Sequence, residues 1–234
     1  MRAVIFDLDD TLLDHQGSTR AALASWLPRL GAEADTRLVE AWFDSEHRHF
    51  ESWRSGQITF EEQRRRRLRD LLPLIGSDVP SEPDLDLLFA GFLAEYEAAW
   101  QAFDDVLPVI TFLTANGFDL AVLTNGTAAQ QNAKVTRIGI RDRLTAVFTS
   151  EELGVAKPHP DIYRQACREL GVSPDKTLHV GDNYQLDVVA AQEAGLQALH
   201  LDRHHKQLAP RELRMVTLAE LPDRLAQPSS GHTV

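Results

Sequence analysis

The chain of 234 residues carries a formal net charge of −11, from 24 basic and 35 acidic side chains. Hydrophobic residues make up 43% of it and charged residues 25%, which is typical of a globular protein with a packed core. The acidic balance speaks against a nucleic-acid polymer or an anionic membrane as a partner. No apolar run approaches membrane-spanning length, no signal-peptide pattern opens the chain, and a single cysteine excludes an internal disulfide, so we expect a cytoplasmic protein.

A short strand is the first element that the sequence predicts, because Val4, Ile5 and Phe6 form a continuous apolar run. Between residues 17 and 101 only helical patterns follow, with Ser18 as a candidate cap of the first helix. From residue 102 onward, strands alternate with helices. Buried strands are predicted at residues 120–123, 145–148, 178–180 and 197–201, and helices at residues 104–115, 160–170 and 185–194. The last residues, Gln227 to Val234, are predicted to form a disordered tail.

The alternation of strands and helices indicates an α/β fold, a Rossmann-like doubly wound parallel sheet with helices on both faces. We expect residues 1–16 and 102–234 to form one core domain. The helical stretch of residues 17–101 interrupts this domain just beyond its first strand, so we expect an inserted all-helical cap domain there. This insertion follows the carboxyl end of the first strand, the edge at which open α/β sheets bind ligands.

Two aspartates follow the first predicted strand, Asp7 directly and Asp9 two positions later. If the extended geometry continues, both side chains point to the same side and converge at the carboxyl end of the strand. Like charges at this separation repel each other unless a cation offsets them, and Mg²⁺ prefers oxygen ligands of this kind. The alternative interpretation is an acidic turn in which Asp10 and Thr11 cap a helix.

Two later loops carry groups suited to a phosphate. Thr124, Asn125 and Gly126 follow the second predicted strand, where a hydroxyl and backbone N–H groups before a helix favour phosphate binding. Ordinary helix capping by Thr124 and Asn125 is the alternative. Lys157 lies in a loop before Pro158, where its ammonium either reaches a phosphate or is simply solvated.

A further acidic cluster follows another buried strand. Asp182 comes directly after Gly181 at the end of that strand, and Asp187 lies five residues further on. A turn aspartate is the alternative interpretation. Acidic residues that recur at the ends of separate buried strands nevertheless indicate a functional site, because the carboxyl ends of parallel strands share one edge of the sheet.

These four signals, in this order, resemble the haloacid dehalogenase-like (HAD) superfamily over nearly the whole chain. The superfamily's motifs are similar, in turn, to Asp7-Leu8-Asp9-Asp10-Thr11-Leu12, Thr124-Asn125-Gly126, Lys157-Pro158, and Gly181-Asp182 with Asp187. The first and fourth motifs are specific, and the second and third are supportive. The helical stretch looks like the cap that one large branch of the superfamily carries after its first motif.

The resemblance implies a role for each matched residue. Asp7 would be the nucleophile that forms an aspartyl-phosphate, and Asp9 would be the general acid and then the base. Asp7, the backbone carbonyl of Asp9 and Asp182 would hold Mg²⁺, while Asp187 would orient a lysine or a metal-bound water. The residues that would bind phosphoryl oxygens are Thr124, Asn125, Gly126 and Lys157. Of these, the threonine and the lysine would also stabilise charge during transfer.

The resemblance also separates the branches of the superfamily. In its dehalogenases, which need no metal, the first motif has Tyr or Phe at the position that corresponds to Asp9. An aspartate at this position favours phosphoryl transfer. We therefore expect a Mg²⁺-dependent phosphatase acting on a small soluble phosphate monoester. A phosphomutase on the same core is one alternative, and a non-catalytic phosphate-binding or regulatory module is another. Nucleotides, sugar phosphates and phosphoglycolate are all candidate substrates, and no pattern indicates an oligomeric state.

The helical stretch carries two further features. Arg64 to Arg67 and Arg69 resemble a nucleic-acid patch, but acidic and leucine residues interrupt them, so we interpret them as an exposed helix face. Trp42 and Trp53 recur at helical spacing, and together with Phe50 they are interpreted as core of the cap; the alternative is that an aromatic ring lines a base or sugar pocket. One of the arginines remains a candidate for contact with the substrate.

Overall fold

The computed structural model describes residues 1–226, and its contacts divide the chain into two compact units. Residues 1–14 and the chain from Gln101 onward form an α/β unit, and residues 15–100 form a helical unit. Among the described residues, no helix is both long enough and apolar enough to cross a membrane. The predicted tail at Gln227 to Val234 lies outside the described residues.

Within residues 1–226, the α/β unit holds one six-stranded parallel sheet with the strand order β3-β2-β1-β4-β5-β6. The strands are Ala3–Phe6 (β1), Asp119–Thr124 (β2), Ala146–Thr149 (β3), Thr177–Gly181 (β4), Gln197–Leu201 (β5) and Arg214–Met215 (β6). Phe6 pairs with Val122 of β2 on one side and with Val180 of β4 on the other. The residues that follow these three strands therefore share one edge, at the point where the strand order reverses and α/β sheets bind ligands.

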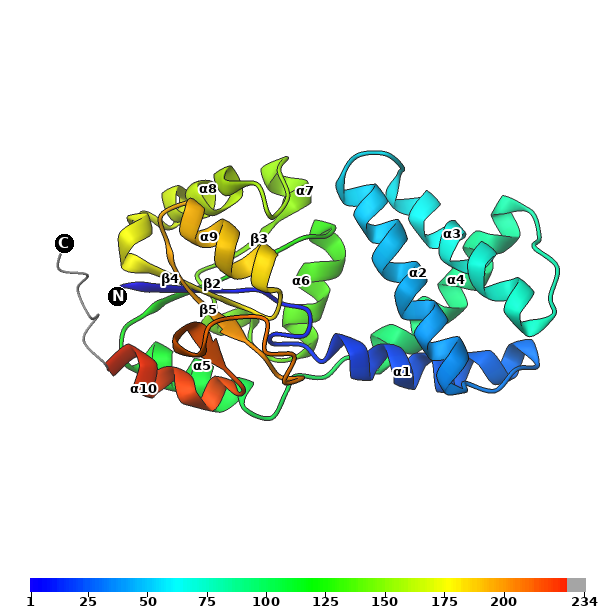
Figure 1. Ribbon diagram of the computed structural model, residues 1–234, viewed down its shortest axis with the longest axis horizontal. Coiled ribbons are helices and arrows are strands. Elements are labelled where there is room, and N and C mark those ends of the chain that lie inside the picture. The colour runs from blue at the N-terminus through cyan, green and yellow to red at the C-terminus, as the bar shows by residue number, and fades with distance from the viewer. Residues whose placement is uncertain (227–234) are drawn as a thin grey trace. The chain divides into compact units, whose positions relative to one another are not determined.

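Helices cover both faces of this sheet, with α8 and α9 on one face and α5 and α10 on the other (Figure 1). The helices of this unit are Val106–Ala115 (α5), Ala128–Arg137 (α6), Ser150–Leu153 (α7), Pro160–Leu170 (α8), Ala190–Glu193 (α9) and Leu221–Ala226 (α10). Ala3 and Ile5 join the apolar cluster under α8, so the alternate residues Val4 and Phe6 face the other side, and all four are fully buried. The predicted doubly wound α/β fold is confirmed.

The helical unit consists of His15–Trp26 (α1), Thr36–Arg54 (α2), Phe60–Leu71 (α3) and Glu82–Ala98 (α4). In it α2 packs on α3, α1 packs on α4, and α3 contacts α4. Ser18, predicted to cap the first helix, instead lies inside α1 and donates a hydrogen bond to the carbonyl of Ala99. That prediction is wrong, because the chain is already helical from His15 and the hydroxyl serves packing between α1 and the end of α4.

An aromatic cluster forms the core of the helical unit, as predicted for Trp42. This side chain is fully buried, with its ring centroid 4.4 Å from that of Phe92. The guanidinium of Arg67 lies 4.3 Å from the Trp42 ring centroid and 3.1 Å from the Glu46 carboxylate. The expectation of an exposed face is wrong for Arg67, since stacking on the aromatic ring and an ion pair together make its burial tolerable.

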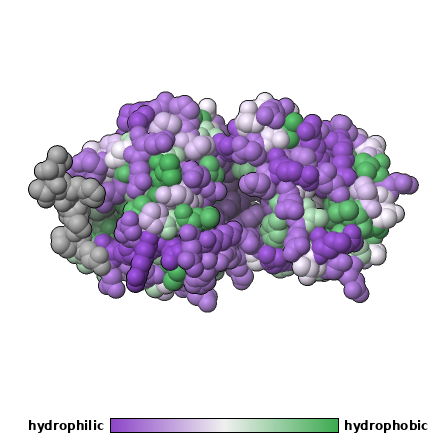
Figure 2. Space-filling model, viewed as in Figure 1, coloured by the Kyte–Doolittle hydropathy of each residue, from purple (hydrophilic) through white to green (hydrophobic). Residues whose placement is uncertain are grey.

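The neighbouring arginines of α3 form ion pairs at the surface of the unit. Arg65 binds both Glu82 and Asp86, and Glu62 accepts hydrogen bonds from Arg66 and Arg69. Figure 2 shows hydrophilic residues prevailing on the visible face of both units. The positive charge of this segment is therefore largely balanced by carboxylates of its own unit.

Candidate active site

The loop after β1 begins the candidate site. The backbone N–H of Asp7 still donates to Val180 of β4, and the chain then turns so that the carbonyl of Leu8 accepts the N–H groups of Thr11, Leu12 and Leu13. Asp10 takes a left-handed φ of 57° in this turn, a conformation that aspartate tolerates better than most residues. The turn brings the carboxyl of Asp7 to the edge at which β2 and β4 also end.

The carboxyl of Asp7 lies 2.6 Å from the Nζ of Lys157 and accepts a hydrogen bond from the Thr11 hydroxyl at 3.2 Å. Both partners of the ion pair are buried. Burial raises the pKa of Asp7 to about 7, against the lowering effect of the Lys157 ammonium. Burial alone would lower the pKa of Lys157, but Asp187 and Asp7 raise it, so the lysine remains a cation.

Asp187 is the second carboxylate on Lys157, with 2.6 Å between its Oδ1 and the Nζ. The same oxygen contacts Nε2 of His179 at 3.1 Å, and Oδ2 accepts the N–H of Asn183. Burial would raise the pKa of Asp187, yet Lys157 and the hydrogen bond with His179 hold it well below its usual range. This carboxylate is therefore ionised and fully engaged, and it contacts the lysine as the resemblance implies.

Close packing at the end of β4 gives Asp187 its place. The residue lies in a π-helical segment, Tyr184–Val189, where an ordinary helix was predicted for residues 185–194; the regular helix α9 begins only at Ala190. Extra-wide turns of this kind recur at functional sites. A Cβ on Gly181 would lie 2.3 Å from the Asp187 carboxyl, so glycine is required for the strand end to approach it.

Asp182 completes a group of carboxylates that fits a hard cation. One carboxylate oxygen from each of Asp7, Asp182 and Asp187 lies within 4.8 Å of the others. Among the described residues, none donates a hydrogen bond to the Asp182 carboxylate, and burial, reinforced by Asp7 and Asp187, raises its pKa well above the usual range. A buried carboxylate crowded by like charges is suited to bind a hard cation such as Mg²⁺. The metal set predicted from the sequence also included Asp9, through its backbone carbonyl.

The second motif lies at the end of β2, and its groups have partners inside the protein. The Asn125 side chain donates to the carbonyl of Lys157 at 3.0 Å and accepts the Lys157 N–H at 2.9 Å. The N–H of Gly126 donates to the Ser150 hydroxyl, and the Thr124 hydroxyl contacts the Gln131 amide at 3.2 Å. Asn125, predicted to bind substrate, thus holds the backbone of the loop that carries the lysine.

Sequence reasoning missed three residues of the site. His179 contacts Asp187, while Lys134 and Gln131 of α6 both reach Asp9. A signal for the last two does exist, since Gln131 and Lys134 share a helix face with the apolar Val135, at the spacing of a core-facing stripe. A glutamine and a lysine on the buried stripe of a helix indicate partners in the interior.

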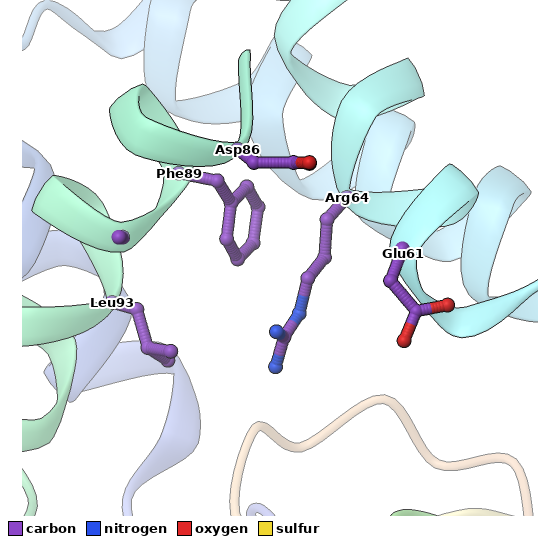
Figure 3. Close-up of a pocket in the computed structure, with 6 residues that line it drawn as sticks. Glu61, Arg64, Asp86, Phe89 and Leu93 are labelled. Atoms are coloured by element: carbon purple, nitrogen blue, oxygen red, sulfur yellow. The ribbon is translucent and has the colours of Figure 1, made fainter. Parts of the chain in front are cut away.

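A cavity of about 230 Å³ lies in the helical unit (Figure 3). Its wall consists of Glu61, Arg64, Asp86, Phe89, Ala90 and Leu93. The Arg64 guanidinium lies 4.4 Å from the ring centroid of Phe60 and 5.3 Å from that of Phe89. No described residue accepts a hydrogen bond from it, and burial lowers its pKa. Figure 3 shows the Arg64 guanidinium pointing into the open space between Leu93 and Glu61.

Comparison with known proteins places the chain in a family. The profile of haloacid dehalogenase-like hydrolases matches residues 1–195. A glyceraldehyde 3-phosphate phosphatase from Methanopyrus kandleri is 32% identical over 218 residues, which cover 90% of this chain and 88% of that protein. The HAD hydrolase YfnB of Bacillus subtilis, solved with bound magnesium, has a TM-score of 0.82 at 24% identity, with 97% of this chain and 99% of that one covered. A 2-haloacid dehalogenase from Pseudomonas syringae has a TM-score of 0.66 at 30% identity, with 97% and 98% covered.

The fold places a group of carboxylates and a buried lysine at the carboxyl edge of a parallel α/β sheet. The chain belongs to the haloacid dehalogenase-like hydrolase family, as the match over residues 1–195 shows. Within this family it is a phosphoric monoester hydrolase, because a relative over most of its length is a phosphatase and because Asp9 supplies the second carboxylate of the first motif. Phosphatases of this family generally use Mg²⁺.

Proposed function

We propose that the chain hydrolyses a small phosphate monoester through a phosphoryl group carried on Asp7. The observation that supports this most directly is the buried ion pair of Asp7 with Lys157, which a further carboxylate, Asp187, holds in place. In the first step an oxygen of the Asp7 carboxylate attacks phosphorus, the bond to the ester oxygen breaks, and Asp9 gives that oxygen a proton. In the second step water attacks the phosphorus, Asp9 takes the proton, and phosphate leaves as Asp7 is restored.

The remaining residues bind and orient the transferred group. We propose that the Lys157 ammonium and the Thr124 hydroxyl contact phosphoryl oxygens and stabilise their charge during transfer. Asp7, the backbone carbonyl of Asp9 and Asp182 would hold Mg²⁺, which when bound offsets the charge of these carboxylates and of the phosphoryl group. Asp187 orients Lys157 through the contact described above.

The choice of substrate is proposed to lie in the helical unit. It follows directly on the catalytic loop in the chain, and it contains the Arg64 cavity, whose size suits a small group. A cation beside aromatic rings favours a ligand with an anionic or polar group next to a short carbon skeleton. Glyceraldehyde 3-phosphate, the substrate named for the Methanopyrus relative, is therefore a first candidate beside nucleotides and phosphoglycolate.

A screen of small phosphate esters with Mg²⁺ tests this function, with inorganic phosphate and isomerised ester as separate readouts. We expect phosphate release that excess chelator abolishes and added Mg²⁺ restores. Undiminished release in chelator would contradict the metal site. Isomerised ester in place of phosphate would indicate a phosphomutase, and ester binding without turnover would indicate a binding module.

A further inference from the structure

Each carboxylate of the Asp7 and Asp9 pair has its own buried lysine. Lys157 binds Asp7, and the Nζ of Lys134 lies 2.6 and 2.8 Å from the two carboxylate oxygens of Asp9. Of the four lysines in the sequence, these two are buried, and Lys176 is exposed. Desolvating an ammonium is costly unless a carboxylate compensates, so the burial of Lys134 depends on Asp9. The proposed mechanism uses Lys157 but leaves Lys134 without a role.

Gln131 lies one turn before Lys134 on the same face of α6, and its side chain also contacts the Asp9 carboxylate. Its Nε2 lies 3.5 Å from the Asp9 carboxylate, 3.2 Å from the Thr124 hydroxyl and 3.2 Å from the Asn125 carbonyl. A Cβ on residue 126 would come within 2.3 Å of this amide, so Gly126 is needed to admit it. The glutamine thereby connects the first and second motifs, while its Oε1 is buried without a partner among the described residues.

We propose that Lys134 is a positioning residue that fixes the orientation of the Asp9 carboxyl group, with Gln131 as a weaker support. This inference rests on the proposed function, in which Asp9 exchanges protons with the leaving oxygen and with water. Proton transfer requires the carboxyl group within hydrogen-bond reach of each partner. An aspartate in a partly open loop samples several rotamers, whereas a carboxylate bound through both oxygens by a buried ammonium has one.

A merely structural ion pair would behave differently from a positioning one. If Lys134 only ties α6 to the catalytic loop, its loss lowers the rate for every substrate in the same proportion. If it orients Asp9, the loss depends on how much the leaving oxygen needs a proton. An alkoxide leaving group needs it, and a nitrophenolate hardly does. The dependence on the leaving group therefore separates the two possibilities.

The test compares Lys134→Met, Lys134→Arg and the exposed control Lys176→Met with the wild-type enzyme in the presence of Mg²⁺. We expect kcat of Lys134→Met on an alkyl phosphate to fall about 10- to 100-fold with KM nearly unchanged, within the range that one acid–base group supplies. With p-nitrophenyl phosphate, the rate constant of the pre-steady-state burst of nitrophenolate should change less than about threefold, since that leaving group needs little protonation. Lys134→Arg should recover most of the alkyl phosphatase activity, and Lys176→Met should match the wild type.

Equal losses on both substrates, or no loss on either, would overturn the role of Lys134. If Lys134→Met does not fold, Gln131→Met gives the second measurement, with the same leaving-group pattern expected at smaller size and uniform loss overturning the proposal. A wild-type enzyme that releases no phosphate from any ester would overturn the proposed function and the inference with it. An active enzyme in which Asp9→Asn shows the leaving-group pattern but neither α6 variant does would overturn the inference alone.

Discussion

The two units treat their buried charges in different ways. In the α/β unit, Asp7, Lys157 and Asp187 form a connected polar group at the edge of the sheet, and each of them comes from a different loop or segment. In the helical unit, the buried cation Arg67 is stacked on Trp42 in an aromatic cluster. The first arrangement leaves crowded carboxylates whose charge a bound cation would offset. In the second, the Glu46 carboxylate and the aromatic rings balance the cation, although Nε of Arg67 has no hydrogen-bond partner among the described residues. The chemistry of the enzyme is thus expected to depend on one unit and its selectivity on the other.

Asp7→Asn gives the sharpest test of the α/β unit. The amide oxygen lacks the charge and nucleophilicity of a carboxylate, so we expect kcat to fall by about 10⁴-fold or more. Hydrolysis of p-nitrophenyl phosphate measures this, with the melting temperature as a control for folding. Asparagine has the same shape and removes like-charge repulsion, so the variant should remain folded. Activity above a few per cent of the wild type would exclude Asp7 as the nucleophile.

Asp9→Asn should be less severe than Asp7→Asn, which would show that the two carboxylates are not equivalent. The variant keeps its backbone carbonyl and loses proton transfer, a change worth about 10²- to 10⁴-fold on alkyl phosphates. With an acidic leaving group the first step should persist, so aspartyl-phosphate should accumulate and become detectable by acid quench. Nearly full activity on an alkyl phosphate would show that Asp9 is only part of the metal site.

The metal-free enzyme should lose stability as the pH rises. The pKa of Asp7 is about 7 in the folded protein and 3.8 in its ordinary state. Between these values the folded state holds a proton that the unfolded chain has released, so the free energy of unfolding falls with rising pH. From pH 5 to pH 8 in chelator we expect a loss of roughly 2 kcal/mol, measured by urea denaturation.

Two controls sharpen this measurement. Asp7→Asn removes the titrating group and should make the pH dependence shallower, although Asp182, whose pKa is also raised, keeps part of it. Saturating Mg²⁺ should oppose the loss, because it binds the ionised carboxylates of the folded state. If the free energy of unfolding in chelator rises from pH 5 to pH 8, the raised pKa of the Asp7 carboxyl is contradicted.

Arg64→Gln addresses the helical unit and should have the smallest effect. We expect the ratio of kcat/KM between phosphoglycolate and p-nitrophenyl phosphate to change about 10-fold, the size of one lost charged hydrogen bond. Arg66→Gln is the matched control, since that side chain binds Glu62, which does not line the cavity. If both variants keep the wild-type ratio, the cavity around Arg64 does not select the substrate. The expectation that selectivity depends on the helical unit would then be wrong.

The positions of the polar residues at the sheet edge were easier to predict from the sequence than those of the residues around them. Buried parallel strands such as β1 read as apolar runs, and polar residues directly after them mark the edge, so Asp7, Thr124 and Asp182 were accessible to local reasoning. Lys134 was not, because its partner Asp9 lies 125 residues earlier and no local pattern records that pairing. An isolated lysine on a helix is usually solvated, and only its place on the buried stripe argues otherwise.

The helical unit shows the same limit more strongly. Trp42 was predicted as core from its spacing, since large aromatic residues at helical intervals are seldom exposed. Arg67 was expected on the surface with its neighbours, because five nearby arginines have the same local appearance. The packing of α3 against α2 and α4 decides the surroundings of each arginine. It determines which one stacks on an aromatic ring, which one pairs with a carboxylate and which one faces the cavity.

The hydrogen bonds of Asn125 bear on how this enzyme tolerates change in its chain length. The side-chain amide binds both the N–H and the carbonyl of Lys157, much as a neighbouring strand would, and so ties together two points 32 residues apart. Because this pair of hydrogen bonds and Asp187 position the lysine, its distance from Asp7 does not depend on the length of the exposed segment Arg141–Arg143. Insertions in that exposed segment should be accepted without moving the ammonium as long as the buried Ile140 and Leu144 on either side are kept, whereas the length from residue 125 to α6, which carries Lys134, should be fixed.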